Sequence, residues 1–244
     1  TIEGFTRIVG YALLLVPIVY FGWFLLDRSW TLLEKKRLAA IALFFVFAAL
    51  FWSAFEQAGS SLNLFAERYT RHAFLGFAYP PSWLQSVNSL FIITLAPVFA
   101  WLWLSLGRRE PSSPSKFAYG LLGAGAGFMV VAFAAILSGP SGERVSPLWL
   151  VAVYLFHTMG ELCLSPVGLS TMTKLAPARV AGQMMGIWFL ALSAGNFIGG
   201  QVAGLFETFP LPGLFGAVAA VSLLCTIAAA ALIGPIRRLM SGVH

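Results

Sequence analysis

Two acidic residues, Glu56 and Glu161, lie inside long apolar stretches of the sequence. A charged side chain near the middle of a membrane helix costs on the order of 3 kcal/mol, so such residues usually bind a ligand, carry a proton or pair with another charge. The apolar stretches that follow residue 37 contain no Lys or Arg that could pair with these acids. We therefore expect each carboxyl group to be protonated, to face water or to have its partner on another chain.

A purely structural interpretation is also open for each acid. About 18 mostly apolar residues precede Glu56, nearly enough to cross a membrane, so a position at the outer interface would also explain it. Glu161 lies about 14 residues into its stretch, roughly 21 Å along a helix axis. A neighbouring helix could satisfy a buried structural acid at that depth. Of the two, Glu161 is the stronger candidate for a functional site.

The surroundings of the two acids match each other. Both acids begin the pattern Glu-x-x-x-Ser, which ends at Ser60 in the first case and at Ser165 in the second. Side chains four residues apart share one face of a helix, so each Glu and Ser are predicted to face the same space. Polar groups at corresponding positions of two helix triplets are typical of secondary transporters with a site near the membrane midplane. Pro166, which has no backbone N–H, is predicted to kink the helix beside Glu161.

Three other side chains are candidates for a site. Asn88, with Gln85 three residues before it, forms a polar patch near the start of an apolar stretch, which favours either ligand binding or hydrogen bonding between helices. Trp188 lies away from the interfacial positions that Trp prefers, so it is predicted to face either a ligand cavity or lipid. His157 lies four residues before Glu161, but two metal ligands without a third are a weak signature. We interpret it as a packed or interfacial histidine and expect no metal site.

The elements that carry these residues follow from the composition. Of the 244 residues, 59% are hydrophobic and 10% charged, whereas soluble proteins carry about 25% charged residues. This excludes a soluble enzyme or a nucleic-acid-binding protein, and the usual hydrolase and metalloprotease motifs do not occur. A membrane helix needs about 20 apolar residues, and strands of a membrane barrel would be shorter and alternating, so the sequence predicts an all-α membrane protein. The seven predicted spans are Phe5–Leu26, Leu38–Phe65, Trp83–Leu106, Phe117–Leu137, Leu148–Met172, Val180–Phe206 and Gly213–Pro235.

The basic residues predict an orientation. Of the 15 Lys and Arg residues, 11 fall on one side of the seven spans, in the segments 28–37, 108–116, 174–179 and 237–238. Cytoplasmic loops carry such an excess, so the N-terminus is predicted to lie outside and the C-terminus in the cytoplasm. An odd number of spans that begins outside is what we expect of a piece of a longer protein.

Several segments resemble one family of transporters. Residues Phe51–Leu62 (FWSAFEQAGSSL) resemble the seventh-helix motif of the proton-dependent oligopeptide transporter family, within the major facilitator superfamily. Residues Gly160–Ser170 (GELCLSPVGLS), with Thr173–Pro177 (TKLAP), resemble its tenth-helix motif. Gln85–Asn88 (QSVN) and Met185–Phe189 (MGIWF) are similar to helices eight and eleven. The resemblance runs from about Leu38 to Pro235, which is most of the chain.

This resemblance implies an architecture and a function. The chain is expected to be the six-helix C-terminal half of a major facilitator fold, preceded by one extra linker transmembrane helix. Residues 1–36 would form the linker helix and a cytoplasmic loop, and residues 37–244 the six-helix half. The implied function is proton-coupled symport of di- and tripeptides by alternating access in the bacterial cytoplasmic membrane. Another carrier of the family, for nitrate or a different small solute, is the alternative.

The resemblance also implies partners and roles for residues. The partners are a di- or tripeptide, the proton as coupling ion, the N-terminal half and the lipid bilayer, with no cofactor and no nucleic acid. Glu161 would receive the amino terminus of the peptide, with help from Asn88 and Ser165, and Trp188 would line the side-chain pocket. Glu56 would be a protonatable gate residue that pairs with a basic residue of the other half. Without that half, the chain is not expected to transport.

Overall fold

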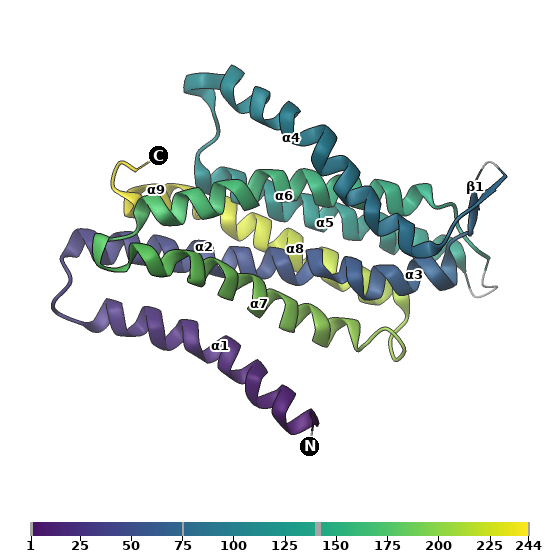
Figure 1. Cartoon of the computed structure of the whole chain (residues 1–244), viewed down its shortest axis with the longest axis horizontal. Coiled ribbons are helices and arrows are strands. Elements are labelled where there is room, and N and C mark those ends of the chain that lie inside the picture. Colours follow the sequence, from purple (N-terminus) through teal and green to yellow (C-terminus); the bar gives the residue numbers. More distant parts are fainter. Residues whose placement is uncertain (1, 75, 140–142, 244) are drawn as a thin grey trace.

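The computed structural model describes residues 2–74, 76–139 and 143–243, which form an elongated bundle of helices (Figure 1). The α-helices are α1 (Ile2–Leu26), α2 (Leu32–Phe55), α3 (Ser61–Tyr69), α4 (Ser86–Leu106), α5 (Ser113–Ser138), α6 (Leu148–Leu175), α7 (Met184–Ala203), α8 (Leu211–Ala231) and α9 (Ile233–Met240). Short 3-10 segments are η1 (Glu56–Gly59), η2 (Pro81–Gln85), η3 (Gly107–Arg109) and η4 (Ala178–Gln183). The strands β1 (Ala73–Phe74) and β2 (Phe77–Ala78) form a small antiparallel hairpin.

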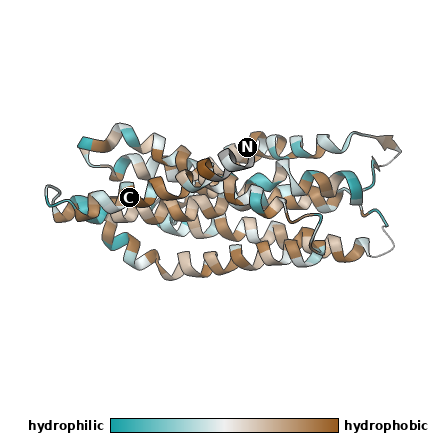
Figure 2. Ribbon diagram, turned by 90° about the horizontal axis from the view of Figure 1, so that it is seen from below, coloured by the Kyte–Doolittle hydropathy of each residue, from teal (hydrophilic) through white to brown (hydrophobic). Residues whose placement is uncertain are grey.

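The prediction of seven spans is confirmed. Within the described residues, seven helical segments are long and apolar enough to cross a membrane, and each overlaps one of the predicted stretches. Two predicted spans differ from the helices of the structure. The second span is broken by η1, and Pro235, the predicted end of the seventh span, lies inside α9. Figure 2 shows hydrophobic residues along the helices and hydrophilic residues mainly towards the two ends. The chain is therefore a multi-pass membrane protein.

The helix α2 begins earlier than predicted because of a capping box. The Thr31 hydroxyl accepts a hydrogen bond from the backbone N–H of Glu34, and the Glu34 carboxylate accepts one from the backbone N–H of Thr31. These bonds satisfy amide groups that would otherwise be free at the helix start. As a result, residues 35–37, expected in a loop, lie in the first turns of α2, and a boundary between residues 36 and 37 falls inside that helix. Just before it, hydrogen bonds from the backbone and hydroxyl groups of Ser29 lower the pKa of Asp27.

Close helix packing in the bundle depends on glycines. The most extensive contacts between described helices are those of α5 with α8 and with α6. A methyl group on Gly123 of α5 would lie 2.9 Å from the Cα of Gly160 in α6, so the two backbones approach directly. On the other side of the bundle, a methyl group on Gly199 of α7 would lie 2.6 Å from the carbonyl oxygen of Ser53 in α2. Small residues permit such approaches in membrane helices, and here they allow close packing of α6 against α5 and of α2 against α7.

The helix α1 packs along α7 and α2 and is fixed to the rest of the chain at one end. The Tyr20 hydroxyl donates a hydrogen bond to Gln183 in η4 at 2.6 Å. The Arg179 guanidinium lies 3.2 Å from the Glu34 carboxylate and 4.0 Å from the centre of the Trp30 ring. These contacts join α1, the start of α2 and the connection between them to the connection between α6 and α7.

The predicted grouping of basic residues is visible in the fold. The connection between α1 and α2, the end of α4, the connection between α6 and α7, and α9 all lie at one end of the bundle (Figure 1). The segments 28–37, 108–116, 174–179 and 237–238, with 11 of the 15 basic residues, belong to these parts. The β-hairpin, α3 and the connection between α7 and α8 lie at the opposite end.

Candidate functional site

The structure brings Asn88 and Glu161 together across the α4–α6 contact. The side-chain amide of Asn88 donates hydrogen bonds to the Glu161 carboxylate, at 3.3 Å, and to the Thr158 hydroxyl, at 2.9 Å. Thr158 lies one turn before Glu161 on α6, so both face α4. Asn88 lies in the first turn of α4, and both Asn88 and Glu161 are half-buried. The result is a polar cluster of carboxylate, amide and hydroxyl groups inside two membrane-spanning segments.

Glu56 lies where the second span is interrupted. The α-helix α2 ends at Phe55, and Glu56 begins the 3-10 segment η1. The backbone of Ser60, with φ −126° and ψ −98°, is outside the helical region. The prediction that Glu56 and Ser60 share a helix face is therefore wrong, because η1 does not keep the α-helical spacing of side chains. A 3-10 interruption within a long helix often marks a hinge at a functional site.

A polar network stabilises this interruption. The side-chain amide of Gln57 donates to the backbone carbonyl of Ser53 at 3.2 Å, and the Ser61 hydroxyl donates to the amide oxygen of Gln57 at 2.8 Å. Gln57 and Ser61 are buried, with 1% and 0% of their surfaces exposed. Polar groups inside a membrane protein need such partners because lipid offers none. The network was missed from the sequence, although the polar run from Glu56 to Ser61 was a signal for it.

Glu56 directly follows α2 and Glu161 lies on α6, and these two helices are in contact with each other. Among the described residues, the ion pairs are Arg68–Glu207, Lys116–Glu110 and Arg179–Glu34, so neither Glu56 nor Glu161 is paired with a cation there. If both carry a charge they repel each other, and protonation of either acid removes that repulsion.

The other predicted site residues lie nearby on α6 and α7. Ser165 is half-buried and lies one turn after Glu161 on the same side of α6. Trp188 is 4% exposed, so it does not face lipid. Its ring packs against Gly168, where an added methyl group would overlap the indole and would lie 2.9 Å from the Phe117 ring. His157 is buried beside the rings of Phe55 and Phe128, with ring centres 6.0 and 5.3 Å away.

One member of the cluster, Thr158, was not singled out from the sequence. It is a single hydroxyl in a long apolar helix, a common feature that does not by itself predict a site. Its spacing of three residues from Glu161 was the available signal, since residues at this spacing share a helix face. The pairing of both with Asn88 depends on how α4 crosses α6, which the spacing of residues does not determine.

Comparison with known proteins relates this arrangement to one family. The model of the POT family matches residues 25–220. The peptide transporter YePEPT of Yersinia enterocolitica subsp. palearctica serotype O:3 (strain YE-P4) is 48% identical over 218 residues, which cover 86% of this chain and 42% of that protein. The uncharacterized transporter YclF of Bacillus subtilis (strain 168) is 42% identical over 243 residues, which cover 100% of this chain and 49% of that protein.

Solved structures agree with the sequence relatives. The crystal structure of a peptide transporter, POT, in complex with sulfate is similar to this chain with a TM-score of 0.92 and 41% identity. The match covers 99% of this chain and 49% of that one, so the chain spans about half the length of the relatives that it matches. The expected fold, half of a major facilitator transporter with one further transmembrane helix, is confirmed. A family model that spans most of the chain and relatives that share more than 40% of its residues identify the chain as a member of the POT family.

Proposed function

We propose that this chain is the C-terminal half of a symporter that couples the uptake of di- and tripeptides to the entry of protons across the bacterial cytoplasmic membrane. Membership of a family whose relatives are named peptide transporters and di-/tripeptide transporters supports the substrate class. Residues 1–36 would comprise the linker helix, its loop and the first residues of α2, and residues 37–244 the rest of the six-helix half. Alternating access would move this half against the N-terminal half.

The single observation that carries the proposal is the cluster of Asn88, Thr158 and Glu161. A carboxylate within a membrane span, without a cationic partner among the described residues, can bind the ammonium group of a peptide. The Asn88 amide holds the Glu161 carboxylate from one side and leaves its other oxygen available. In this proposal Ser165 adds a hydroxyl on the same face of α6, and Trp188 borders the space for peptide side chains.

Glu56 has a different role in the proposal. It lies at a break in the second span rather than in the hydrogen-bonded cluster. We propose that Glu56 binds and releases the coupling proton and pairs, when charged, with a basic residue of the other half. Protonation would break that ion pair and change the relative stability of the outward-open and inward-open states of the transporter.

The proposal is tested by dipeptide binding to the purified full-length transporter. Glu161→Gln keeps the shape of the side chain but removes its charge, so the affinity for dialanine should fall roughly 10- to 100-fold, the loss expected for one charged hydrogen bond. Binding is measured by titration calorimetry. Glu143→Gln, at an exposed loop position, is the matched control and should bind like the wild type.

A peptide with a blocked amino terminus shows whether weaker binding by Glu161→Gln reflects the loss of this contact or a general loss of the fold. N-acetyl-dialanine has no ammonium group, so the wild type should bind it as weakly as Glu161→Gln binds dialanine. If the wild type accumulates no dipeptide in liposomes under an inward proton gradient, the peptide assignment fails. If peptide is taken up but Glu161→Gln binds dialanine normally, only the role of Glu161 fails.

A further inference from the structure

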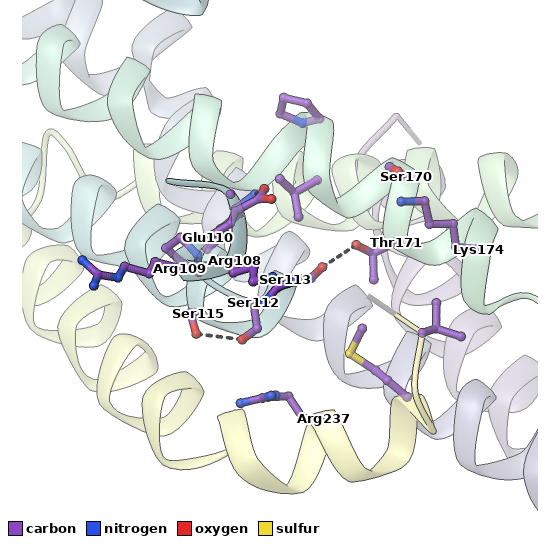
Figure 3. Close-up of a pocket in the computed structure, with 17 residues that line it drawn as sticks. Arg108, Arg109, Glu110, Ser112, Ser113, Ser115, Ser170, Thr171, Lys174 and Arg237 are labelled. Carbon is purple, nitrogen blue, oxygen red and sulfur yellow. Dashed lines mark hydrogen bonds and ion pairs between the residues drawn. The ribbon is translucent and has the colours of Figure 1, made fainter. Parts of the chain in front are cut away.

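A cavity of about 770 Å³ opens at the basic end of the bundle, away from the proposed peptide site. Its walls come from the segment after α4, the start of α5, the last turns of α6 and the C-terminal helix α9 (Figure 3). The volume is in the range of small-molecule binding sites, which is roughly 300–1,000 Å³. The proposed transport mechanism gives this cavity no role.

The cavity has a strong excess of positive charge. Its charged lining consists of five cationic side chains and one carboxylate, namely Arg108, Arg109, Lys116, Lys174, Arg237 and Glu110. Lys116 is buried, and its ammonium group pairs with Glu110 and lies 4.4 Å from the centre of the Trp103 ring. These two charges balance each other. The other four cations have no ion-pair partner among the described residues, so the cavity attracts anions.

Hydroxyl groups line the same cavity. The Thr171 hydroxyl of α6 donates to the Ser113 hydroxyl at 2.9 Å, and the hydroxyls of Ser112 and Ser115 are 2.8 Å apart. Figure 3 shows these hydroxyl groups surrounded by four cations from different parts of the chain: Arg108, Arg109, Lys174 and Arg237. Several guanidinium and hydroxyl donors around one space suit an anion with several oxygen atoms, because each oxygen can accept more than one hydrogen bond.

The position of the cavity points to the membrane surface. It lies at the ends of three candidate spans, where a bilayer crossed by these spans would have its lipid headgroups rather than its hydrocarbon core. The helix α9 is amphipathic: Ile236 and Met240 are buried against the bundle, whereas Arg237 and Arg238 are exposed. Basic pockets between membrane helices on the cytoplasmic side are suited to anionic lipid headgroups. We propose that this cavity binds a phosphate group, carried by an anionic phospholipid or free in solution.

The experiment measures binding of phosphatidylglycerol to the purified full-length protein in detergent by native mass spectrometry. The double variant Lys174→Gln/Arg237→Gln removes two cations of the cavity lining, one on α6 and one on α9. Two charges near a phosphate account for roughly a 30-fold change in affinity, so binding should weaken by about that factor. The control is Lys36→Gln/Arg238→Gln, which removes two exposed charges from the same end of the bundle but outside the cavity lining. The control should bind the lipid like the wild type.

Two further ligands distinguish the sources of the phosphate group. If inorganic phosphate displaces phosphatidylglycerol and itself binds less well to the cavity variant, the site accepts soluble phosphate; if only the lipid binds, the site is a headgroup site. Either result supports the proposal. Equal binding of zwitterionic phosphatidylcholine, equal weakening in the control variant, or no binding by the wild type would overturn it. The last result is expected if an acidic segment of the other half fills the cavity.

Discussion

At the scale of single residues, the roles proposed for Glu56 and Glu161 have a consequence for coupling. The acids lie on different helices and differ in their contacts, since Glu161 accepts a hydrogen bond from Asn88 and Glu56 lies at the start of η1. In the proposed mechanism, an ammonium group bound at Glu161 would offset the charge of that carboxylate and so weaken its repulsion of a charged Glu56. In this proposal, substrate and proton would therefore influence each other without sharing one carboxylate.

This separation of roles predicts a distinctive defect for Glu56→Gln. A neutral amide cannot take up or release a proton, so accumulation of dipeptide driven by a proton gradient should fall at least roughly tenfold. Exchange of labelled for unlabelled dipeptide across liposomes requires no net proton movement and should continue. Glu67→Gln, an exposed position on α3, is the matched control. Gradient-driven accumulation at the wild-type level in Glu56→Gln would remove Glu56 from the coupling mechanism.

At the scale of elements, the contact of α6 with α7 depends on the absence of a side chain at Gly168. An alanine there would gain about 1 kcal/mol of helix propensity, but its methyl group would overlap the Trp188 ring. Overpacking of this kind costs typically 1–3 kcal/mol, so Gly168→Ala should lower the thermal stability of the full-length protein in detergent. Thermal unfolding followed by tryptophan fluorescence or static light scattering measures the effect.

A matched glycine and a second substitution test this explanation. Gly186 is also in a helix, but an added methyl group there would meet nothing within 4 Å, so Gly186→Ala should be neutral or stabilising. Adding Trp188→Phe to Gly168→Ala should recover part of the lost stability, because the smaller ring leaves room for the methyl group. Equal melting temperatures for Gly168→Ala and Gly186→Ala would mean that the indole moves aside without cost.

The elements differ in how far the sequence predicts them. The length of the apolar stretches was sufficient to predict seven spans, because lipid imposes a minimum length on every membrane helix. The interruption at Glu56–Gly59 was not predicted, since apolar residues such as Leu62 and Phe65 continue the stretch beyond it. The early start of α2 was also missed, because the charges at 34–37 indicate a loop unless the capping box formed by Thr31 and Glu34 is considered.

For the candidate site, the sequence predicts the key residue but not the contacts that this residue makes with other helices. An acid deep in an apolar stretch is unusual enough to single out Glu161 by itself. The contact between Asn88 and Glu161 joins residues separated by 73 positions, and spacing along one helix contains no information on such a contact. The expectation that they act together came from the resemblance to a transporter family. The cavity of cations at the basic end was not predicted, because loop charges indicate orientation without showing which of them converge.

At the scale of the whole molecule, the uneven distribution of basic residues predicts the orientation in the membrane. The end with the β-hairpin should face outwards and the end with α9 the cytoplasm. Single cysteines introduced as Glu143→Cys and Lys36→Cys, both at exposed positions at opposite ends, test this. In intact cells a membrane-impermeant maleimide should label Glu143→Cys, and it should label Lys36→Cys only after permeabilisation.

The two native cysteines of this chain do not obscure that measurement. Cys163 and Cys225 are both inside spans, one buried and one half-buried, and alanine replaces both in the background used for labelling. The reverse labelling pattern would contradict the orientation and would move the basic cavity to the outer leaflet. Labelling of both positions in intact cells would indicate leaky cells, which a cytoplasmic marker protein reveals.

The packing of α5 against α8 also has a consequence for how the protein is made. These two helices form one of the most extensive contacts of the described chain, yet α6 and α7 lie between them in the sequence. Gly125 of α5 packs against Leu223 and Ser222 of α8, residues that the ribosome adds about a hundred positions later. During synthesis, α5 is made before α8, so α8 cannot cover this face of α5 until it has followed α6 and α7. Neighbours in this bundle are therefore not neighbours in the order of synthesis, and the contact between α5 and α8 forms only after α8 has left the ribosome.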